Sequence, residues 1–168
     1  MADEIKSTLL GLWLGAALFF SAVVAPNVFA VLRGFDLANA NEIAGTIVTR
    51  TLAVINISGF AIGLLSLAIV YVGRRSGGFA FMIELVSAAL LAATTGIGYW
   101  AVAARMRALR TAMVTIDLVS PQDPRHVAFD NLHHYSVSLL GGAIVAAAIL
   151  FVMSRRRVRL GTIGGPHA

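Results

Sequence analysis

The chain of 168 residues is 58% hydrophobic and 12% charged, with a mean hydropathy of +0.85. Soluble globular domains carry roughly 25% charged residues, so this composition excludes an ordinary water-soluble domain. The lack of cysteine excludes disulfides, thiolate nucleophiles, iron–sulfur clusters and cysteine-ligated zinc. The net charge of +5 does not indicate a nucleic-acid partner, because the arginines stand at the ends of apolar runs and not on a basic surface.

Four apolar runs predict an all-α fold, an integral membrane four-helix antiparallel bundle. We expect spans at about 8–32, 51–73, 80–104 and 135–154, each long enough to cross roughly 30 Å of hydrocarbon. They form a single transmembrane domain over residues 1–168. The first run exceeds the ~7–15 apolar residues of a secretory signal, so we interpret it as a retained helix. Pro26 is expected to kink or end that helix.

The second helix is predicted to be longer than a membrane requires. Asn39 followed by Glu42 resembles a capping box and predicts a helix over about 40–73. At ~1.5 Å per residue this helix extends about 50 Å, so its first part should project beyond the bilayer. Gly59 and Gly63 lie on one face, which predicts close packing against a helix of this chain or of another subunit.

The third and fourth helices are predicted to project on the same side. Apolar residues continue at helical spacing after the third span and predict a helix to about Leu118. These residues are Met106, Leu109, Met113 and Ile116. Asp123 as N-cap and Pro124 as first helical residue predict the start of the fourth helix. Helices 2, 3 and 4 should therefore extend beyond the bilayer on one side, in an extramembrane overhang of about 33–50 and 105–134.

The two ends of the predicted bundle carry nearly equal numbers of positive residues. The orientation in the membrane is therefore indicated mainly by the segment 155–159. That segment carries four arginines in five residues. Positive residues beside a span favour the cytoplasmic side. We therefore expect a multi-pass protein of the cell inner (plasma) membrane with both termini cytoplasmic.

A histidine cluster is the sharpest candidate for a metal site. His126, Asp130 and His133 are spaced by four and three residues, which places them on one helix face, and His134 is adjacent. Imidazole and carboxylate groups at this spacing can bind zinc, copper or iron if Glu42 or Asp36 completes the ligand shell. The alternatives are a solvated helix face and a proton-handling role. The sequence does not decide whether this face points inward.

Charged and aromatic side chains near the span ends have several candidate roles. The candidates for contact with a lipid or another anion are Arg105, Arg107 and Arg110, which could also form local ion pairs. Glu84 is expected to pair with Arg74 or Arg75 across the short turn between the second and third helices. Interface or packing roles are expected for Trp13, Tyr99 and Trp100.

Four segments carry a resemblance to a known family: LWLGAALFFSAVVAPNVFAVL (12–32), EIAGTIVTRTLAVIN (42–56), AVAARMRALR (101–110) and FDNLHHYSVSLL (129–140). In this order they resemble the first helix, the second helix, the end of the third helix and the fourth helix of the bacterial DUF4149 proteins. The family is related to the transmembrane protein 205-like group, within a broader set of copper-resistance-D-like bundles. The resemblance implies a four-helix fold, with these residues on matching positions: Trp13, Gly15, Phe20, Pro26, Arg50, Arg110, Leu132 and His133.

The resemblance gives no support for haem. Relatives in the broader set that bind haem or copper carry a histidine near the start of the first helix, where this chain has Ser7 and Thr8. A divalent or copper ion at the fourth-helix histidines remains the candidate cofactor.

The sequence lacks the motifs of the common enzyme classes. A phosphate-binding loop, an HExxH motif, a GxSxG motif and a pair of catalytic carboxylates are all missing. The leading hypothesis is a non-enzymatic binding or accessory subunit of a membrane assembly, with the lipid bilayer, other membrane subunits or a second copy of the chain as partners. The alternatives are a copper- or zinc-handling protein that uses His126, Asp130 and His133, and a small-solute or lipid transporter.

Overall fold

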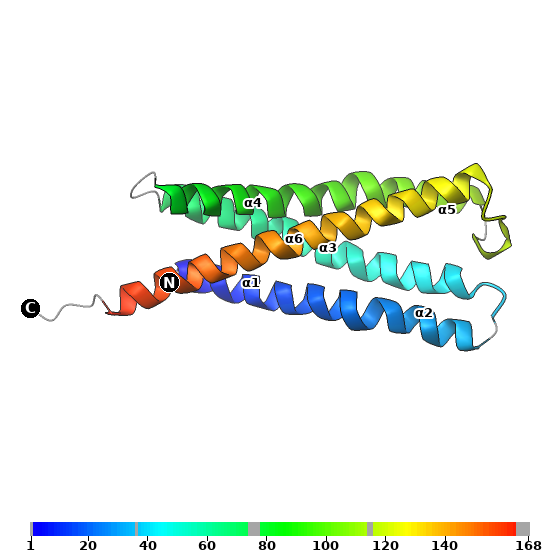
Figure 1. Ribbon diagram of the computed structural model, residues 1–168, viewed down its shortest axis with the longest axis horizontal. Helices are drawn as coiled ribbons and strands as arrows, with labels where there is room; N and C mark the ends of the chain where they lie inside the picture. Colours follow the sequence, from blue (N-terminus) through cyan, green and yellow to red (C-terminus); the bar gives the residue numbers. More distant parts are fainter. Residues whose placement is uncertain (1, 36, 74–77, 114–115, 164–168) are drawn as a thin grey trace, which may run out of the picture.

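The computed structural model is a bundle of four long helical rods (Figure 1). It describes residues 2–35, 37–73, 78–113 and 116–163, the last seven of these as backbone only. The first rod consists of α1 (Ala2–Phe19), the π-helical turn η1 (Phe20–Val24) and α2 (Ala25–Gly34), and the second is α3 (Ala40–Val72). The third consists of α4 (Phe79–Ile97), the π-helical turn η2 (Gly98–Val102) and α5 (Ala103–Met113). A short 3-10 helix, η3 (Ile116–Leu118), leads to α6 (Pro124–Ile163).

All four rods are long and apolar enough to cross a membrane. The qualifying helices are Ala2–Gly34, Ala40–Val72, Phe79–Met113 and Pro124–Arg156. Successive rods run in opposite directions, and no strand occurs in the part of the chain that the structure describes (Figure 1). The predicted class, an all-α four-helix antiparallel membrane bundle, is confirmed.

The core lies where α1, α3, α4 and α6 meet. α3 packs on α4, α6 packs on both α1 and α4, and α1 also packs on α3. Leu10, Leu91 and Leu150 are fully buried at the centre, together with small residues of α6 that bring the helices close. These small residues are Ala143, Ala146 and Ala147. The described residues of this half of the molecule therefore form a packed hydrophobic core.

Glycine on α3 provides the close contact that its spacing predicted. A Cβ added to Gly63 would lie 2.8 Å from the backbone nitrogen of Ala92 on α4. A Cβ added to Gly59 would lie 2.8 Å from the Trp13 ring, whose Nε1 donates a 2.9 Å hydrogen bond to the Ile55 carbonyl. The packing partners of this glycine face are thus helices of the same chain, and Trp13 is a buried packing residue.

The first rod does not end at Pro26. Helix continues to Gly34 through a π-helical turn, in which the Ala25 N–H donates to the carbonyl of Phe20, five residues earlier. This π-helical turn lies just before Pro26. Proline has no backbone N–H group, so it cannot donate the usual helical hydrogen bond. Asn27 donates a 2.7 Å hydrogen bond to the Val23 carbonyl. Pro26 therefore interrupts the α-helical hydrogen bonding without ending the helix.

Two details of the predicted overhang are corrected. Asn39 is the residue before α3, but its side chain makes no cap hydrogen bond, because Asp117 takes that position from a distant part of the chain. α5 extends to Met113, and Ile116 to Leu118 form a 3-10 turn instead of a further part of an α-helix. The predicted continuous helix to Leu118 was wrong, since η3 turns the chain back toward α3.

Other details of the same region are confirmed. Met113, Ile116 and Phe129 form a small buried cluster between α5, η3 and α6, and Met106 and Leu109 pack against it. Asp123 caps α6, since its Oδ1 accepts a 2.8 Å hydrogen bond from the Arg125 backbone N–H, and α6 begins at Pro124.

Candidate functional site

Two adjoining cavities lie between α2, α3, α5 and α6. The first, the polar cavity, has a volume of about 420 Å³ and lies between the start of α3, α5, η3 and the start of α6. The second, the apolar cavity, has a volume of about 410 Å³ and lies between η1, α2, α3 and the middle of α6. Their walls share five residues: Phe29, Val48, Thr49, Met106 and His133. The two volumes therefore form one elongated site with a polar and an apolar end.

Arg110 on α5 is the central charged group of the polar cavity. Its Nε lies 3.4 Å from Oε1 of Glu42 on α3, and its Cζ lies 5.3 Å from the centre of the Phe129 ring on α6. A Cβ added to Gly45 would lie 2.5 Å from Nη2, so the guanidinium occupies the space that a larger residue would fill. Three helices therefore fix the position of this side chain.

The hydrogen-bonding capacity of Arg110 is unused within the described residues. A guanidinium carries five N–H donors, yet the polar contact of Arg110 with the described residues is the 3.4 Å ion pair with Glu42, which is not a hydrogen bond. The Nε atom is buried without a hydrogen-bond acceptor, and Oε2 of Glu42 is buried without a donor. Buried polar groups are normally hydrogen-bonded, so this arrangement is suited to a ligand that brings acceptors into the cavity.

Asp117 also lines the polar cavity, but both of its carboxylate oxygens already accept hydrogen bonds from α3. Its Oδ1 accepts hydrogen bonds from the Asn41 backbone N–H at 3.3 Å and side chain at 2.8 Å, and its Oδ2 accepts one from the Glu42 N–H at 3.0 Å. These are the free donors at the first turn of α3. The carboxylate therefore caps α3 and balances the positive end of its dipole.

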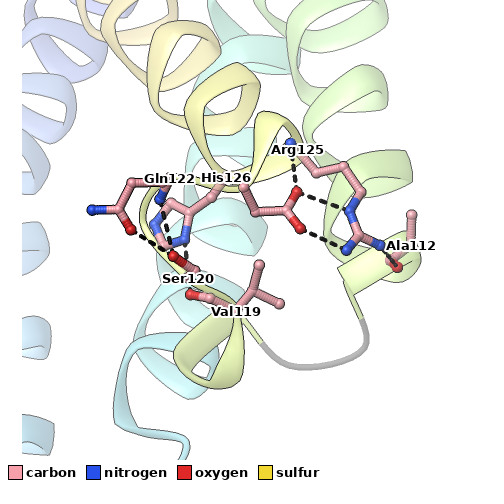
Figure 2. Close-up of polar contacts among 7 residues, drawn as sticks. Ala112, Val119, Ser120, Gln122, Arg125 and His126 are labelled. Carbon is pink, nitrogen blue, oxygen red and sulfur yellow. Dashed lines mark hydrogen bonds and ion pairs between the residues drawn. The ribbon is translucent and has the colours of Figure 1, made fainter.

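The predicted face of α6 borders the polar cavity. His126, Asp130 and His133 all line the polar cavity, whereas Tyr135 is 65% exposed. The His126 Nδ1 lies 3.3 Å from the Val119 carbonyl, a contact drawn in Figure 2, and its Nε2 lies 3.9 Å from Asp130 Oδ2. The rings of His133 and His134 are 6.3 Å apart. Asp130 and His133 nevertheless remain exposed, so this face lies along the edge of the cavity and not in the protein core.

These groups do not gather as a metal centre in the described part of the chain. No set of three or more histidine, aspartate or glutamate side chains there is placed to hold one ion. Glu42, a predicted member of the shell, pairs with Arg110 instead, and Asp36 lies outside the described residues. Metal binding at His126, Asp130 and His133 stays a prediction.

The other candidate arginines do not line the two cavities. Arg105 and Arg107 are exposed on α5, and Arg50 is exposed beside a shallow pocket that includes Phe20 and Val24. Of the three arginines predicted to contact a lipid or another anion, the structure places Arg110 alone in a cavity wall.

Arg125 joins the start of α6 to the end of α5. Its side chain lies 2.8 Å from Asp123 Oδ2 and donates to the Ala112 carbonyl at 3.0 Å (Figure 2). The hydrogen bonds from the side chain and backbone of Arg125 lower the pKa of Asp123 to about 2. The same contacts raise the pKa of Arg125. This pair ties the start of α6 to the end of α5.

Sequence reasoning missed a buried charge group at the opposite end of the bundle. Lys6, which stands just before the first predicted span, is 1% exposed. Its Nζ lies 3.0 Å from Asp3 Oδ1 and 3.5 Å from Glu84 Oε2. The predicted partners Arg74 and Arg75 lie outside the described residues. The signal that could have revealed the local contact is the spacing of Asp3 and Lys6, one helical turn apart.

The fold and the elongated cavity define a multi-pass membrane protein with four apolar helices and an internal site of small-molecule size. The chain belongs to the DUF4149 family, described as a domain of unknown function, whose profile matches residues 8–115. No curated protein and no solved structure matches the chain. The matched stretch includes Trp13, Pro26, Arg50 and Arg110 and ends before α6, so Leu132 and His133 lie outside it.

Proposed function

We propose that this protein is a non-enzymatic binding module of the membrane, which holds a small-molecule ligand in the joined polar and apolar cavities. The observation that carries the proposal is Arg110, whose buried Nε has no hydrogen-bond acceptor and whose side chain is fixed in the wall of a ligand-sized cavity. Binding sites typically have volumes of about 300–1,000 Å³ and are mostly apolar, with a few well-placed polar groups. The two joined cavities fit that description.

Binding is favoured over transport by the packing of the other half of the bundle. The apolar cavity reaches Ile144 on α6, and the following residues Ala146, Ala147 and Leu150 are fully buried in the core. A transporter requires a path that can open on both sides of the membrane. The filled half of the bundle supports a site that opens at one end.

A role as an accessory subunit is compatible with binding. The small cluster of Met113, Ile116 and Phe129 would keep the projecting end rigid enough to meet another membrane subunit or a second copy of the chain. We further propose a relationship to the transmembrane protein 205-like and copper-resistance-D-like bundles. The arginine-rich segment 155–159 supports an inner-membrane orientation with cytoplasmic termini.

The binding proposal is tested by filling the apolar cavity. Gly141 lines this cavity, and a Cβ added there meets no atom within 4 Å, so Gly141→Leu inserts a side chain without a backbone clash. The matched control is Gly15→Leu, since Gly15 also has open space around its Cβ position but lines neither cavity. Each purified protein is examined by native mass spectrometry in mild detergent.

We expect small molecules to co-purify with the wild type and with Gly15→Leu, and to be reduced in Gly141→Leu by about ten-fold or more. Equal amounts on all three proteins, or none on the wild type, would refute the binding proposal.

A further inference from the structure

We propose that the ligand is a phospholipid of the surrounding bilayer, with its phosphate on Arg110 and one acyl chain in the apolar cavity. This inference rests on the proposed binding function and specifies the ligand. A guanidinium matches phosphate oxygens with two parallel N–H donors, and Arg110 meets Glu42 through its Nε, with no ion pair to a described carboxylate on its Nη groups. The polar cavity is wide enough for a head group, and the apolar cavity continues from it.

The neighbouring carboxylates leave Arg110 able to bind an anion. Glu42 contacts the Nε edge of the guanidinium, and Asp117 is occupied by the free N–H groups of α3. The Asp130 side chain is 61% exposed and lies at the rim beside His126. None of these three carboxylates accepts a hydrogen bond from the Nη groups of Arg110.

The apolar cavity opens sideways toward the lipid. α2 packs against α3, whereas α6 packs against α1, α4 and α5. α2 and α6 do not pack closely on each other, so a space lies between them. The rim residues Ser21 and Pro26 on the first rod and Val137 and Gly141 on α6 are exposed. A lipid could therefore enter from the bilayer without crossing the polar end.

The orientation of the joined cavity matches that of a lipid in one leaflet. The apolar wall contains Phe20, Leu52 and Ile144, which belong to three of the apolar runs that are expected to span the membrane. Arg110 lies six residues beyond the expected end of the third span, a distance of about 9 Å along the helix. The phosphate site would thus lie at the membrane surface and the chain site within the hydrocarbon.

The test measures binding of defined lipids to the full-length protein in detergent by native mass spectrometry. The probes are phosphatidylglycerol with palmitoyl and oleoyl chains, diacylglycerol with the same chains, oleate and inorganic phosphate. The variants are Arg110→Gln, Arg110→Lys and Gly141→Leu. Arg105→Gln is the matched control, because it removes the same charge from an exposed position on α5 outside both cavities.

We expect the wild type and Arg105→Gln to bind phosphatidylglycerol about ten-fold or more tightly than diacylglycerol. Arg110→Gln should lose this preference, and Arg110→Lys should retain part of it, because a lysine keeps the charge but not the paired donors. Gly141→Leu should weaken binding of both lipids. If Arg110→Gln does not fold, the combined results for Arg110→Lys and Gly141→Leu decide the proposal.

Three outcomes would overturn the inference, and each is distinct from failure of the binding function. Equal affinity for diacylglycerol would exclude a phosphate contact, and equal affinity for oleate would show that any anionic head group suffices. Binding of inorganic phosphate that depends on Arg110 but is unaffected by Gly141→Leu would assign the site to a free anion. In all three cases a ligand still binds, whereas failure of the binding function leaves the wild type with none.

Discussion

Asp117 contacts residues that lie 75 and 76 positions earlier in the chain. Its two carboxylate oxygens accept hydrogen bonds from the consecutive backbone N–H groups of Asn41 and Glu42. Helix caps are usually supplied by the residue directly before the helix, which here is Asn39. The cap therefore also ties η3 to α3 and closes one wall of the polar cavity.

Replacement of this cap gives a sharp test of the local structure. Asp117→Ala should lower the free energy of unfolding by about 1 kcal/mol, a typical value for loss of an N-cap. It should also speed hydrogen exchange at the Asn41 and Glu42 amides, measured by mass spectrometry. Asn39→Ala should change neither quantity, since its side chain makes no cap bond. An equal effect of both substitutions would support the capping box that the sequence alone suggests.

The Asp123–Arg125 pair predicts a dependence of stability on acid pH. The pKa of Asp123 falls from its usual 3.8 to about 2 in the folded protein, mainly through hydrogen bonds from Arg125. A carboxyl group with a lowered folded-state pKa stabilises the fold above its unfolded pKa and loses this contribution as the pH falls through the folded value. The stabilisation should therefore be complete above about pH 4 and decline toward pH 2.

Thermal unfolding in detergent checks this dependence. The wild type should unfold at a higher temperature than Asp123→Asn at pH 6, and the difference should shrink as the pH approaches 2. A difference that stays constant over this interval would contradict a role for the Asp123 charge.

The helices α3 and α4 approach each other closely at a glycine. Among the described glycines, this one has the shortest distance from an added Cβ to a backbone atom. The site of contact is Gly63, where any Cβ would lie 2.8 to 2.9 Å from the nitrogen, Cα and Cβ of Ala92. Because two of these three atoms are backbone, a side chain at this position requires the helices to move apart. Overpacking of this kind typically costs about 1–3 kcal/mol.

We expect Gly63→Ala to destabilise the protein by about that amount. Gly15→Ala is the control, since a Cβ there meets no atom within 4 Å and the substitution favours helix formation by up to about 1 kcal/mol. Both variants are compared with the wild type by unfolding in a mixed detergent series. Equal stability of the two variants would mean that α3 and α4 do not approach closely at Gly63.

The helices could be predicted from the sequence because their signals lie within short stretches of the chain. Long apolar runs determine the four helices, and Asp123 with Pro124 marks the start of α6 through interactions within one turn. Arg110 was a candidate, but its pairing with Glu42, its packing on Phe129 and its fit against Gly45 involve three helices. The spacing of residues along one helix carries no information about such contacts, so neither the cavity nor the Asp117 cap could be derived from it.

The molecule as a whole places its polar cavity at one end of the bundle and its filled core toward the other. The ends of α2 and α5 and the starts of α3 and α6 lie together at the end that contains Arg110, as Figure 1 shows. Each of the four apolar helices is at least 33 residues long, which corresponds to about 50 Å against roughly 30 Å of hydrocarbon. The central claim is that this cavity-bearing end projects from a single membrane surface.

Cysteine labelling tests this claim most directly, because the sequence has no cysteine of its own. Single variants Asn39→Cys, Ser120→Cys, Arg156→Cys and Ile57→Cys are treated with a membrane-impermeant maleimide in sealed vesicles of known orientation. We predict that positions 39 and 120 are labelled from the same side, position 156 from the opposite side, and position 57 only after detergent is added. Labelling of positions 39 and 120 from opposite sides, or of position 57 in intact vesicles, would contradict the account.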